Sequence, residues 1–377
     1  MESMDMQATQ QSLSDNKKIA LALSGGGIRA MVFHLGVITY LAEQQRLEQV
    51  SHISTVSGGS LITGLIFQQN NMKWPTSEQF LSFVRPQIKR ILCHSSLMTG
   101  TLKQFLNPVN LQYVFSRAHV LSKAIKSEWK ISANLTDLPD YPEWSINGTV
   151  GETGRRFRFK KCDFGDYDSG YIKTTEHAFP LCDAMAISAA FPVGIGPLSI
   201  ETKDYTWYKR KWNEPPEKAI HCTQKHKTLH LYDGGVYDNL GLESFFDIAK
   251  QEKKEKLSED TILIVSDASS PLDEHVPSLY KLATRFLHII DIIYNQNRSL
   301  RVRSLVSYLR KHKGKGVYLP IKTKIPESNG IDEFAMHFST SLQQLTEEEF
   351  DKLYRHGYHV CRQYYFFISD KSYTDIF

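Results

Sequence analysis

The stretch STVSGGS at residues 54–60 places a serine where many hydrolases place a nucleophile. Ser57 stands two residues after Thr55 and two residues before Gly59, which is a variant of the G-x-S-x-G nucleophile elbow. In such an elbow the serine occupies a tight turn between a strand and a helix, and small neighbours leave room for the backbone. The amide of Gly58, at the start of the expected helix, is placed to donate to an oxyanion. The pattern predicts attack of the serine on a carbonyl carbon, with an ordinary loop serine as the alternative.

A glycine triplet earlier in the chain offers further backbone donors. Gly25, Gly26 and Gly27 follow the apolar run IALAL and precede a helical pattern. Glycines at a strand-to-helix junction let backbone amides approach a negative charge, either a phosphate or a developing oxyanion. A nucleophile at Ser57 favours the oxyanion. Arg29 follows the triplet and would contact either a substrate phosphate or a carboxylate at the edge of the sheet.

The serine needs a base, and a carboxylate follows another expected strand. Asp233 ends the run TLHLYD and is followed by Gly234 and Gly235. If the sheet is parallel, this carboxylate lies at the same edge as the serine, whereas the alternative is that it only caps the turn. Asp238 and Asp267 compete for the same role. Because an ordinary aspartate has a pKa of about 3.9, the base must be buried so that its pKa is raised.

These three motifs occur in this order in the patatin-like phospholipases, and the chain resembles that family. GGGIRA resembles its oxyanion and phosphate loop, TVSGG its elbow and DGG its D-G-[AG] motif, while AISAAFP at residues 186–192 resembles its small-residue helix before a proline. The resemblance extends from Ile19 to about Leu242, and the later stretches IIYNQNRSLRVR and LTEEEF resemble those of bacterial members. Thr55 and Ala30 depart from the pattern, because they replace glycines. Since a β-branched residue disfavours a positive φ, Thr55 is expected in ordinary strand geometry.

The resemblance implies a serine acyl hydrolase that works through a Ser57–Asp233 dyad. Asp233 would accept the proton of Ser57 during attack on an ester, and the amides of the glycine loop and of Gly58 would hold the oxyanion. Asp233 would then activate the water that hydrolyses the acyl-serine. The implied activity is that of a phospholipase of the A type on membrane phospholipids, with transient contact to the membrane surface. We expect no cofactor and no metal, because no acidic loop has cation-ligand spacing.

The resemblance also implies an α/β fold of three layers, with a central, mostly parallel sheet flanked by helices. Continuous apolar runs such as IALAL predict buried parallel strands, and EWSINGTV with RRFRFK predicts a hairpin. We expect a disordered tail at residues 1–16 and a single catalytic domain at residues 17–377. Within that domain we expect a helical insertion at about 74–130 and a C-terminal helical extension at about 275–377. Apolar residues at helical spacing across residues 242–249 predict one more helix.

Two basic segments have two interpretations each. Residues 80–92 show an amphipathic helix pattern that would cover the core or dock on an anionic membrane, and the core is favoured. Residues 298–315 would form a solvated helix face or a membrane contact, and the solvated face is favoured. Near the C-terminus, Thr346 and Glu349 predict a capping box at the start of a helix.

The composition limits the class of protein and its compartment. The 377 residues carry a formal net charge of +4, which is too weak to indicate nucleic-acid binding but is compatible with contact to anionic lipid. The five cysteines are scattered, which indicates a reducing compartment. The N-terminus does not resemble a signal peptide, and no apolar run reaches the roughly 18 residues of a membrane span. We therefore expect a cytoplasmic protein with peripheral contact to the inner face of the membrane, and the oligomeric state is left open.

Three other functions remain alternatives. A nucleotide-binding domain would use the glycine triplet, but Ala30 stands where the third glycine of G-x-G-x-x-G belongs. An ordinary Ser-His-Asp esterase would take its base from His288, His312 or His337. A catalytically impaired member of the family would act as a lipid-binding or regulatory module.

Overall fold

The computed structural model of the chain describes most of its length. The described residues are 17–104, 106, 108–113, 116–192, 194–211, 214–270, 282–326 and 328–369. The tail expected at residues 1–16 lies outside them.

A mixed sheet of 12 strands runs through the centre of the described part of the chain. Its strands are β1 (Ile19–Leu23), β2 (Val50–Thr55), β3 (Glu143–Val150), β4 (Arg156–Phe159), β5 (Asp163–Asp166), β6 (Gly170–Lys173), β7 (Leu198–Glu201), β8 (Tyr208–Lys209), β9 (Ile220–His221), β10 (Thr228–Asp233), β13 (Ile262–Asp267) and β14 (Gly316–Pro320). The helices are α2 (Gly27–Glu43), α3 (Gly58–Gln69), α4 (Ser77–Gln79), α5 (Arg85–His94), α6 (Leu97–Gln104), α7 (Ala118–Glu128), α8 (Leu181–Ser188), α9 (Gly235–Asp238), α10 (Leu282–Lys311), α11 (Ile331–His337) and α12 (Glu347–Ser369).

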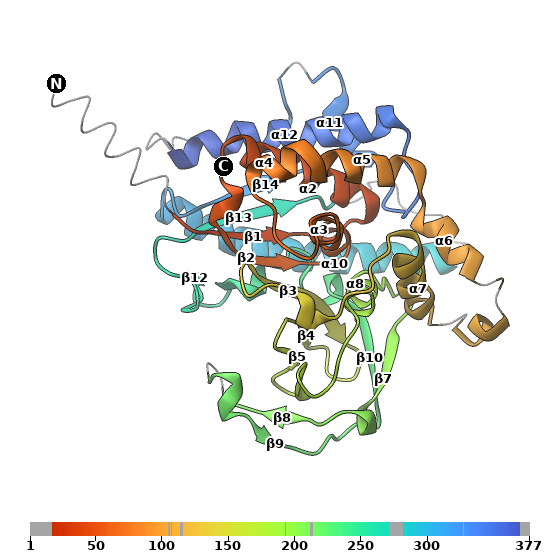
Figure 1. Ribbon diagram of the computed structural model, residues 1–377. Coiled ribbons are helices and arrows are strands. Elements are labelled where there is room, and N and C mark those ends of the chain that lie inside the picture. The colour runs from red at the N-terminus through yellow and green to blue at the C-terminus, as the bar shows by residue number, and fades with distance from the viewer. Residues whose placement is uncertain are drawn as a thin grey trace.

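The parallel half of the sheet is covered by helices on both faces. Its order is β14-β13-β1-β2-β3, and all four pairings are parallel. Successive residues of β1 alternate between two cores: Leu21 packs in the larger core with residues of α2, α3 and α12, whereas Ala22 packs in the smaller core with Leu305 and Leu309 of α10. Figure 1 shows these helices on the two sides of the sheet. The predicted α/β fold of three layers is confirmed.

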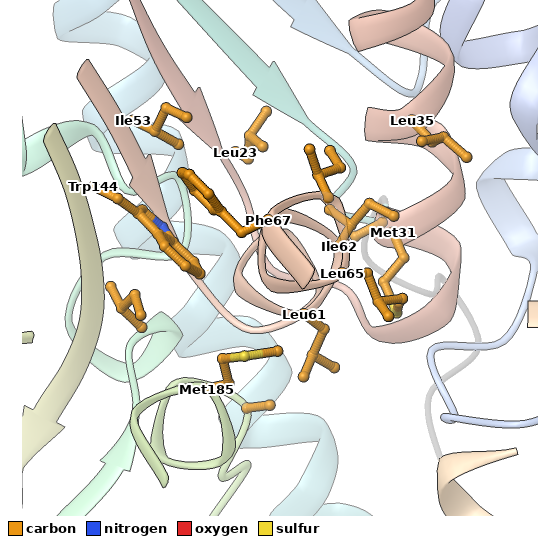
Figure 2. Close-up of a cluster of buried hydrophobic side chains, with 14 of the residues drawn as sticks. Leu23, Met31, Leu35, Ile53, Leu61, Ile62, Leu65, Phe67, Trp144 and Met185 are labelled. Carbon is orange, nitrogen blue, oxygen red and sulfur yellow. The ribbon is translucent and has the colours of Figure 1, made fainter. Parts of the chain in front are cut away.

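The larger core surrounds α3, the helix that follows Ser57. In Figure 2, Phe67 of α3 lies beside Trp144, with Leu23 and Ile53 nearby. The rings of Phe67 and Trp144 stack with their centroids 5.2 Å apart. Aromatic burial of this kind holds a helix firmly against its sheet. The start of α3 is therefore a rigid platform for the residues at its N-terminus.

Beyond β3 the sheet becomes antiparallel. β3 and β4 form the predicted hairpin, and β5, β6, β8 and β9 continue the antiparallel series. β10 also pairs antiparallel with β3, with Asp233 opposite Gly148. The premise that Asp233 ends a parallel strand is therefore wrong. Ile146 is the last residue of β3 that pairs with β2, and β3 runs four residues past it. β10 returns along this extension to the edge where β2 ends.

The segment at residues 74–130 is helical and packs over the sheet. A π-helical turn at Phe80–Val84 joins α4 to α5, and α6, the 3-10 helix η3 (Pro108–Tyr113) and α7 follow. The apolar face of the 80–92 segment is buried in the larger core, and Lys89 on its other side donates to Asp351 of α12 at 2.7 Å. The core-covering interpretation of this segment is correct.

The helix predicted at residues 242–249 is wrong. The chain there forms a short 3-10 turn (η7, Leu242–Ser244) after Gly241, whose φ is +67°, and then a hairpin of β11 (Phe246–Asp247) and β12 (Glu252–Lys253). Leu242, Phe245 and Phe246 are buried in the smaller core, so their spacing reflects burial and not a helix, and Ala249 is exposed. The capping box predicted near the C-terminus is present at the start of α12. The amide of Thr346 donates to the carboxylate of Glu349 at 2.8 Å, and the amide of Glu349 donates to the hydroxyl of Thr346 at 3.2 Å.

The arginines of α10 also differ from the prediction. Arg298 and Arg301 do not form part of a solvated face, because both side chains point inward to buried carboxylates. Arg298 pairs with Asp267 at 2.6 Å, and Arg301 pairs with Asp238 at 3.3 Å. Ion pairs between buried groups hold α10 against the ends of β10 and β13.

Candidate active site

Ser57 lies in a tight turn between β2, which ends at Thr55, and α3, which begins at Gly58. Its backbone has φ 50° and ψ −119°, a conformation that residues with a side chain rarely adopt. Strain at this one residue is typical of a nucleophile elbow, because it presents the hydroxyl at the top of the sheet. Thr55 ends the strand without a positive φ, as predicted for a β-branched residue.

The two glycines after the serine are required by close packing. A Cβ atom on Gly58 would lie 2.3 Å from the carbonyl oxygen of Gly27, and one on Gly59 would lie 2.5 Å from the carbonyl oxygen of Leu23. Side chains cannot fit at such distances. The first contact also places the N-terminus of α3 directly against that of α2.

Asp233 is buried beside the serine. Its side chain is 4% exposed and accepts hydrogen bonds from the Ser57 hydroxyl and from the amide of Gly235, the latter at 2.6 Å. Burial raises the pKa of this carboxyl to about 7, against the opposing effect of the two hydrogen bonds. The predicted burial and raised pKa are confirmed. Gly234 is also fixed by packing, because a Cβ there would lie 2.4 Å from the carbonyl oxygen of Asn147.

Asp267 and Asp238, which compete with Asp233 for the role of base, are each paired with an arginine. Asp267 accepts hydrogen bonds from Arg298 at 2.7 Å and from the Tyr318 hydroxyl at 2.5 Å, and Arg298 holds its pKa below the usual range despite complete burial. Asp238 pairs with Arg301 and caps the following turn. A carboxylate that an arginine holds in this way is a poor proton acceptor, so of the three aspartates Asp233 remains as the candidate base.

The N-termini of α2 and α3 point backbone amides at the serine. Gly26 caps α2 with φ +141°, Gly27 begins it with φ +57°, and Gly58 begins α3. Among the described residues, no backbone acceptor takes the amide of any of the three. The prediction that Gly25 belongs to this set is wrong, because its amide donates to the carbonyl of Asn239 at 3.0 Å. Three amides at two helix N-termini can stabilise an oxyanion.

A cavity of about 430 Å³ lies over these groups. Its floor includes Ser57 and Asp233, and apolar side chains of Phe191, Ile195 and Leu342 form part of its wall. Its lining among the described residues contains no histidine. His288, His312 and His337, the candidate bases of a Ser-His-Asp triad, therefore lie away from it. An apolar wall beside a polar floor suits an ester with a long acyl chain.

Tyr294 of α10 lines the same cavity and was not singled out from the sequence. Its ring packs on Phe191 with centroids 5.9 Å apart, and its buried hydroxyl has no hydrogen-bond partner among the described residues. Burial, followed by the nearby Asp233 carboxylate, raises the pKa of this phenol, so the hydroxyl is a donor at any physiological pH. A buried donor without a partner is available to a bound substrate. The one indication in the sequence was that Tyr294 lies in IIYNQNRSLRVR, a stretch that resembles bacterial members of the family.

Arg29 has a structural position. Its guanidinium is buried and donates to the carbonyl of Ala268 at 2.9 Å, to that of Phe338 at 3.0 Å and to the hydroxyl of Ser270. Burial lowers its pKa to about 10, although Asp267 nearby opposes this effect. All three of its nitrogens are used by the protein. The contact predicted with a phosphate is therefore not supported. The partners of Arg29 are backbone carbonyls and the hydroxyl of Ser270, and not a carboxylate at the sheet edge.

The hydroxyl of Thr55 explains how a threonine serves where the family pattern has glycine. It accepts a hydrogen bond from the indole of Trp144 at 2.9 Å and lies 2.8 Å from the hydroxyl of Ser60. The hydroxyls of Ser60 and Ser188 are 2.8 Å apart, and Ser188 accepts the amide of Ser57 at 3.0 Å. This buried chain of hydroxyls connects the strand to the strained backbone of the elbow.

We predict that Thr55→Val lowers both stability and kcat. The change keeps the β-branched shape but leaves the buried indole N–H of Trp144 without an acceptor, which costs about 1–3 kcal/mol. Urea unfolding measures this loss, and steady-state kinetics should show a lower kcat with little change in KM, because the elbow is displaced. Thr55→Ser, which keeps the hydroxyl, is the matched control. Wild-type stability in the valine variant would contradict the role of this chain of hydroxyls.

The raised pKa of Asp233 predicts the pH dependence of hydrolysis. Below a pH of about 7 the carboxyl is protonated and cannot accept the serine proton, so kcat/KM should fall about tenfold for each pH unit of acidification. The profile should be level above this pKa. It is measured with a soluble ester from about pH 5 to about pH 9, and a level profile across that range would exclude Asp233 as the base.

Comparison with known proteins agrees with this architecture. The family model described as patatin-like phospholipase matches residues 21–246. The match spans more than half of the chain, so the chain belongs to the patatin-like phospholipase family. A search of curated proteins finds no match.

Two solved structures of one human enzyme share the fold at low sequence identity. Human GIVD cytosolic phospholipase A2 superposes with a TM-score of 0.50 at 13% identity, over 92% of this chain and 58% of that longer chain. The same human enzyme in complex with methyl gamma-linolenyl fluorophosphonate gives 0.50 at 12% identity, over 93% and 58%. VipD from Legionella pneumophila gives 0.38 at 14% identity, over 93% and 66%. This chain thus aligns with less than two thirds of the human enzyme.

Two further searches cover the described residues alone. Among the helices described, none has the length and apolar character needed to span a bilayer. Nor do the described residues include a group of three or more histidine, cysteine, aspartate or glutamate side chains that could hold a metal ion.

Proposed function

We propose that this protein hydrolyses fatty-acyl esters of membrane phospholipids, using Ser57 as nucleophile and Asp233 as base. The observation that carries the proposal is the buried carboxylate of Asp233, which accepts the Ser57 hydroxyl and has a pKa raised to about 7. A base with a pKa near the working pH combines a useful ionised fraction with a real affinity for the serine proton.

The first step of the proposed reaction forms an acyl-serine. Ser57 Oγ attacks the ester carbonyl while its proton passes to Asp233, and the negative charge on the carbonyl oxygen is held by the amides of Gly26, Gly27 and Gly58. The tetrahedral intermediate collapses as the C–O bond to the leaving group breaks. The proton on Asp233 passes to that alcohol, which leaves as a lysophospholipid.

The second step restores the enzyme. Asp233 takes a proton from a water molecule, the resulting oxygen attacks the acyl carbonyl, and the same amides stabilise the second oxyanion. Collapse breaks the bond to Ser57 Oγ, which regains its proton from Asp233. The fatty acid is released. No metal or cofactor enters either step.

The substrate class is supported by the cavity and by the comparisons. The apolar wall of the cavity suits a fatty-acyl chain, and the family to which the chain belongs is that of patatin-like phospholipases. The human enzyme with a similar fold is a phospholipase A2, and it binds a linolenyl fluorophosphonate. We also propose a cytoplasmic location with contact to the inner face of the membrane, for which the scattered cysteines are the support.

The proposal is tested by incubating the full chain with phosphatidylcholine vesicles and measuring the products by mass spectrometry. We expect free fatty acid and lysophosphatidylcholine in equal amounts, and covalent labelling of Ser57 by an alkyl fluorophosphonate. Release of fatty acid only from a triacylglycerol emulsion would replace the phospholipid with neutral lipid. Absence of hydrolysis and of labelling would favour the catalytically impaired, lipid-binding alternative.

A further inference from the structure

Exposed large apolar side chains gather in two segments of the chain. Among the described residues, 13 such side chains are exposed, and nine of them lie in the α6–η3 segment or in α10. In the first segment they are Met98, Leu102, Leu106 and Val109, which are 46% to 83% exposed. In α10, Phe286, Ile289, Ile293 and Leu300 are 50% to 60% exposed and recur at intervals of three, four and seven residues, which is one stripe of a helix. Concentration of this kind indicates an interaction surface.

Both segments border the mouth of the candidate active site. The exposed half of α10 also supplies Asp291, Tyr294 and Asn295 to the cavity wall. The amide of Met98, in α6, donates to the carbonyl of Leu342, which lines the cavity. At the end of the η3 segment, the amide of Arg117 donates to the carbonyl of another lining residue, Ile195. Figure 1 shows α6 and α7 at one end of the molecule, toward which α10 extends.

The charge of this region indicates what covers it. Residues 97–130 contain five basic side chains and one acidic side chain, so this segment alone carries a net charge of +4, the formal net charge of the whole chain. Lys103 and Lys126 within it are exposed. Apolar side chains flanked by cationic ones match the interface of an anionic bilayer, where the former enter the acyl region and the latter meet phosphate groups.

The 80–92 helix offers less of this combination, because Phe83 is its one large apolar side chain that is exposed. Its apolar side is buried in the larger core, and Lys89 and Arg85 on the opposite side bond to α12, at Asp351 and Tyr354. The α6–η3 segment and α10 are therefore better candidates for membrane contact than the 80–92 helix.

We propose that a docking face, defined as the eight exposed apolar residues above together with Lys103 and Lys126, seats the protein on an anionic phospholipid bilayer. The proposal rests on the proposed function, since it deepens the account of how the same cavity meets its substrate. With this face on the bilayer, the mouth of the cavity opens onto the lipid. An acyl chain then passes from the bilayer to the apolar cavity wall without crossing water, where its exposure is unfavourable.

The test separates binding from hydrolysis. The full chain carrying Ser57→Ala, which cannot consume the lipid, is co-sedimented with vesicles of equimolar phosphatidylcholine and phosphatidylglycerol. Addition of Leu102→Glu and Leu106→Glu, or of Phe286→Glu and Ile293→Glu, should weaken binding at least about tenfold, since each change removes a side chain worth that much on burial. Ile220→Glu, at a residue that is 72% exposed on β9, is the matched control and should bind as Ser57→Ala alone does.

A charge variant guards against loss of folding. Lys103→Gln with Lys126→Gln introduces no buried charge and should weaken binding to these vesicles several-fold, while binding to pure phosphatidylcholine changes little. In the active background, the face variants should keep their rate on a soluble short-chain ester and lose it on vesicles.

Each outcome is decisive. Vesicle binding that is unchanged in all the face variants, or an absence of vesicle binding by Ser57→Ala itself, would overturn the docking face while hydrolysis of the soluble ester leaves the proposed function standing. Binding that depends on the face, in a protein that hydrolyses no ester, would support the face and reject the proposed function. Self-association that the face variants abolish, without vesicle binding, would assign the surface to a second copy of the chain and overturn the proposal.

Discussion

The Ser57→Ala and Asp233→Asn variants should each lose at least about a thousandfold in kcat/KM for a soluble ester. The first removes the hydroxyl of Ser57, a residue of the elbow that lines the cavity. The second keeps the size of the side chain but removes its capacity to accept the serine proton. Because the two groups act in one proton transfer, the double variant should be little worse than either single variant. A chromogenic short-chain ester gives the rates, and an alkyl fluorophosphonate should label the wild type but not Ser57→Ala.

Stability measurements distinguish a loss of kcat/KM that is chemical from one that is due to unfolding. The folded-state pKa of Asp233 is about 7, above the value of about 3.9 for the unfolded chain, so folding binds a proton between these values. The free energy of unfolding contributed by this group therefore decreases as the pH rises through that window. Asp233→Asn removes this dependence and should be no less stable than the wild type at alkaline pH.

A second carboxylate in the cavity provides the matched control. Asp291 of α10 lines the same cavity but, unlike Asp233, is exposed. Asp291→Asn should keep kcat within a few-fold of the wild type. Equal turnover by the wild type, Ser57→Ala and Asp233→Asn would reject the dyad.

The sequence predicted the centre of the fold because local patterns determine it. Strands β1 and β13 are short, mostly apolar runs that only a sheet covered on both faces can bury, and β2 contains several β-branched residues. The glycines of the elbow are required because a Cβ atom there would lie less than 2.6 Å from neighbouring backbone. Such features lie within a few residues of one another in the sequence. Their consequence, a strained serine at the N-terminus of α3, could therefore be predicted in advance.

The direction of β10 could not be predicted in this way. It depends on β3 being longer than β2, so that the extension at residues 147–150 offers a free edge on which β10 returns. An aspartate before two glycines looks the same whether its strand is parallel or antiparallel. Asp233 lies beside the serine as predicted, but the prediction assumed a parallel strand, and β10 is antiparallel to β3.

The remaining differences arise from contacts between distant parts of the chain. The amide of Gly25 is taken by Asn239, and Arg29 is taken by carbonyls near residues 268 and 338, more than 200 residues away in each case. Tyr294 reaches the cavity from α10 in the same way. Which donor is left free for a substrate depends on these partners, and no local pattern records them.

Arg298→Met should lower the free energy of unfolding by about 3–5 kcal/mol, since it leaves a buried carboxylate without its partner. Asp267 is fully buried, and Arg298 contacts it through two nitrogens, at 2.6 and 2.7 Å. The pKa of this aspartate lies below its usual range because of Arg298, so its contribution to stability is present above the unfolded pKa and is lost as the pH falls. Denaturant unfolding at neutral pH measures the loss. Arg303→Met, at an exposed position of the same helix, is the control and should change stability little.

A double variant separates an unpaired charge from lost packing. In Arg298→Met with Asp267→Asn neither charge of this pair remains, so most of the stability lost in the single variant should return, and the acid-dependent decline that Asp267 causes should disappear. If the double variant is as unstable as Arg298→Met, packing of the arginine stem and not the ion pair holds α10 on the sheet. The result matters for the cavity, because α10 carries Tyr294 and much of the docking face. If the ion pair positions this helix, a variant at Arg298 that still folds should raise the KM for vesicle substrates more than it changes the kinetics on the soluble ester.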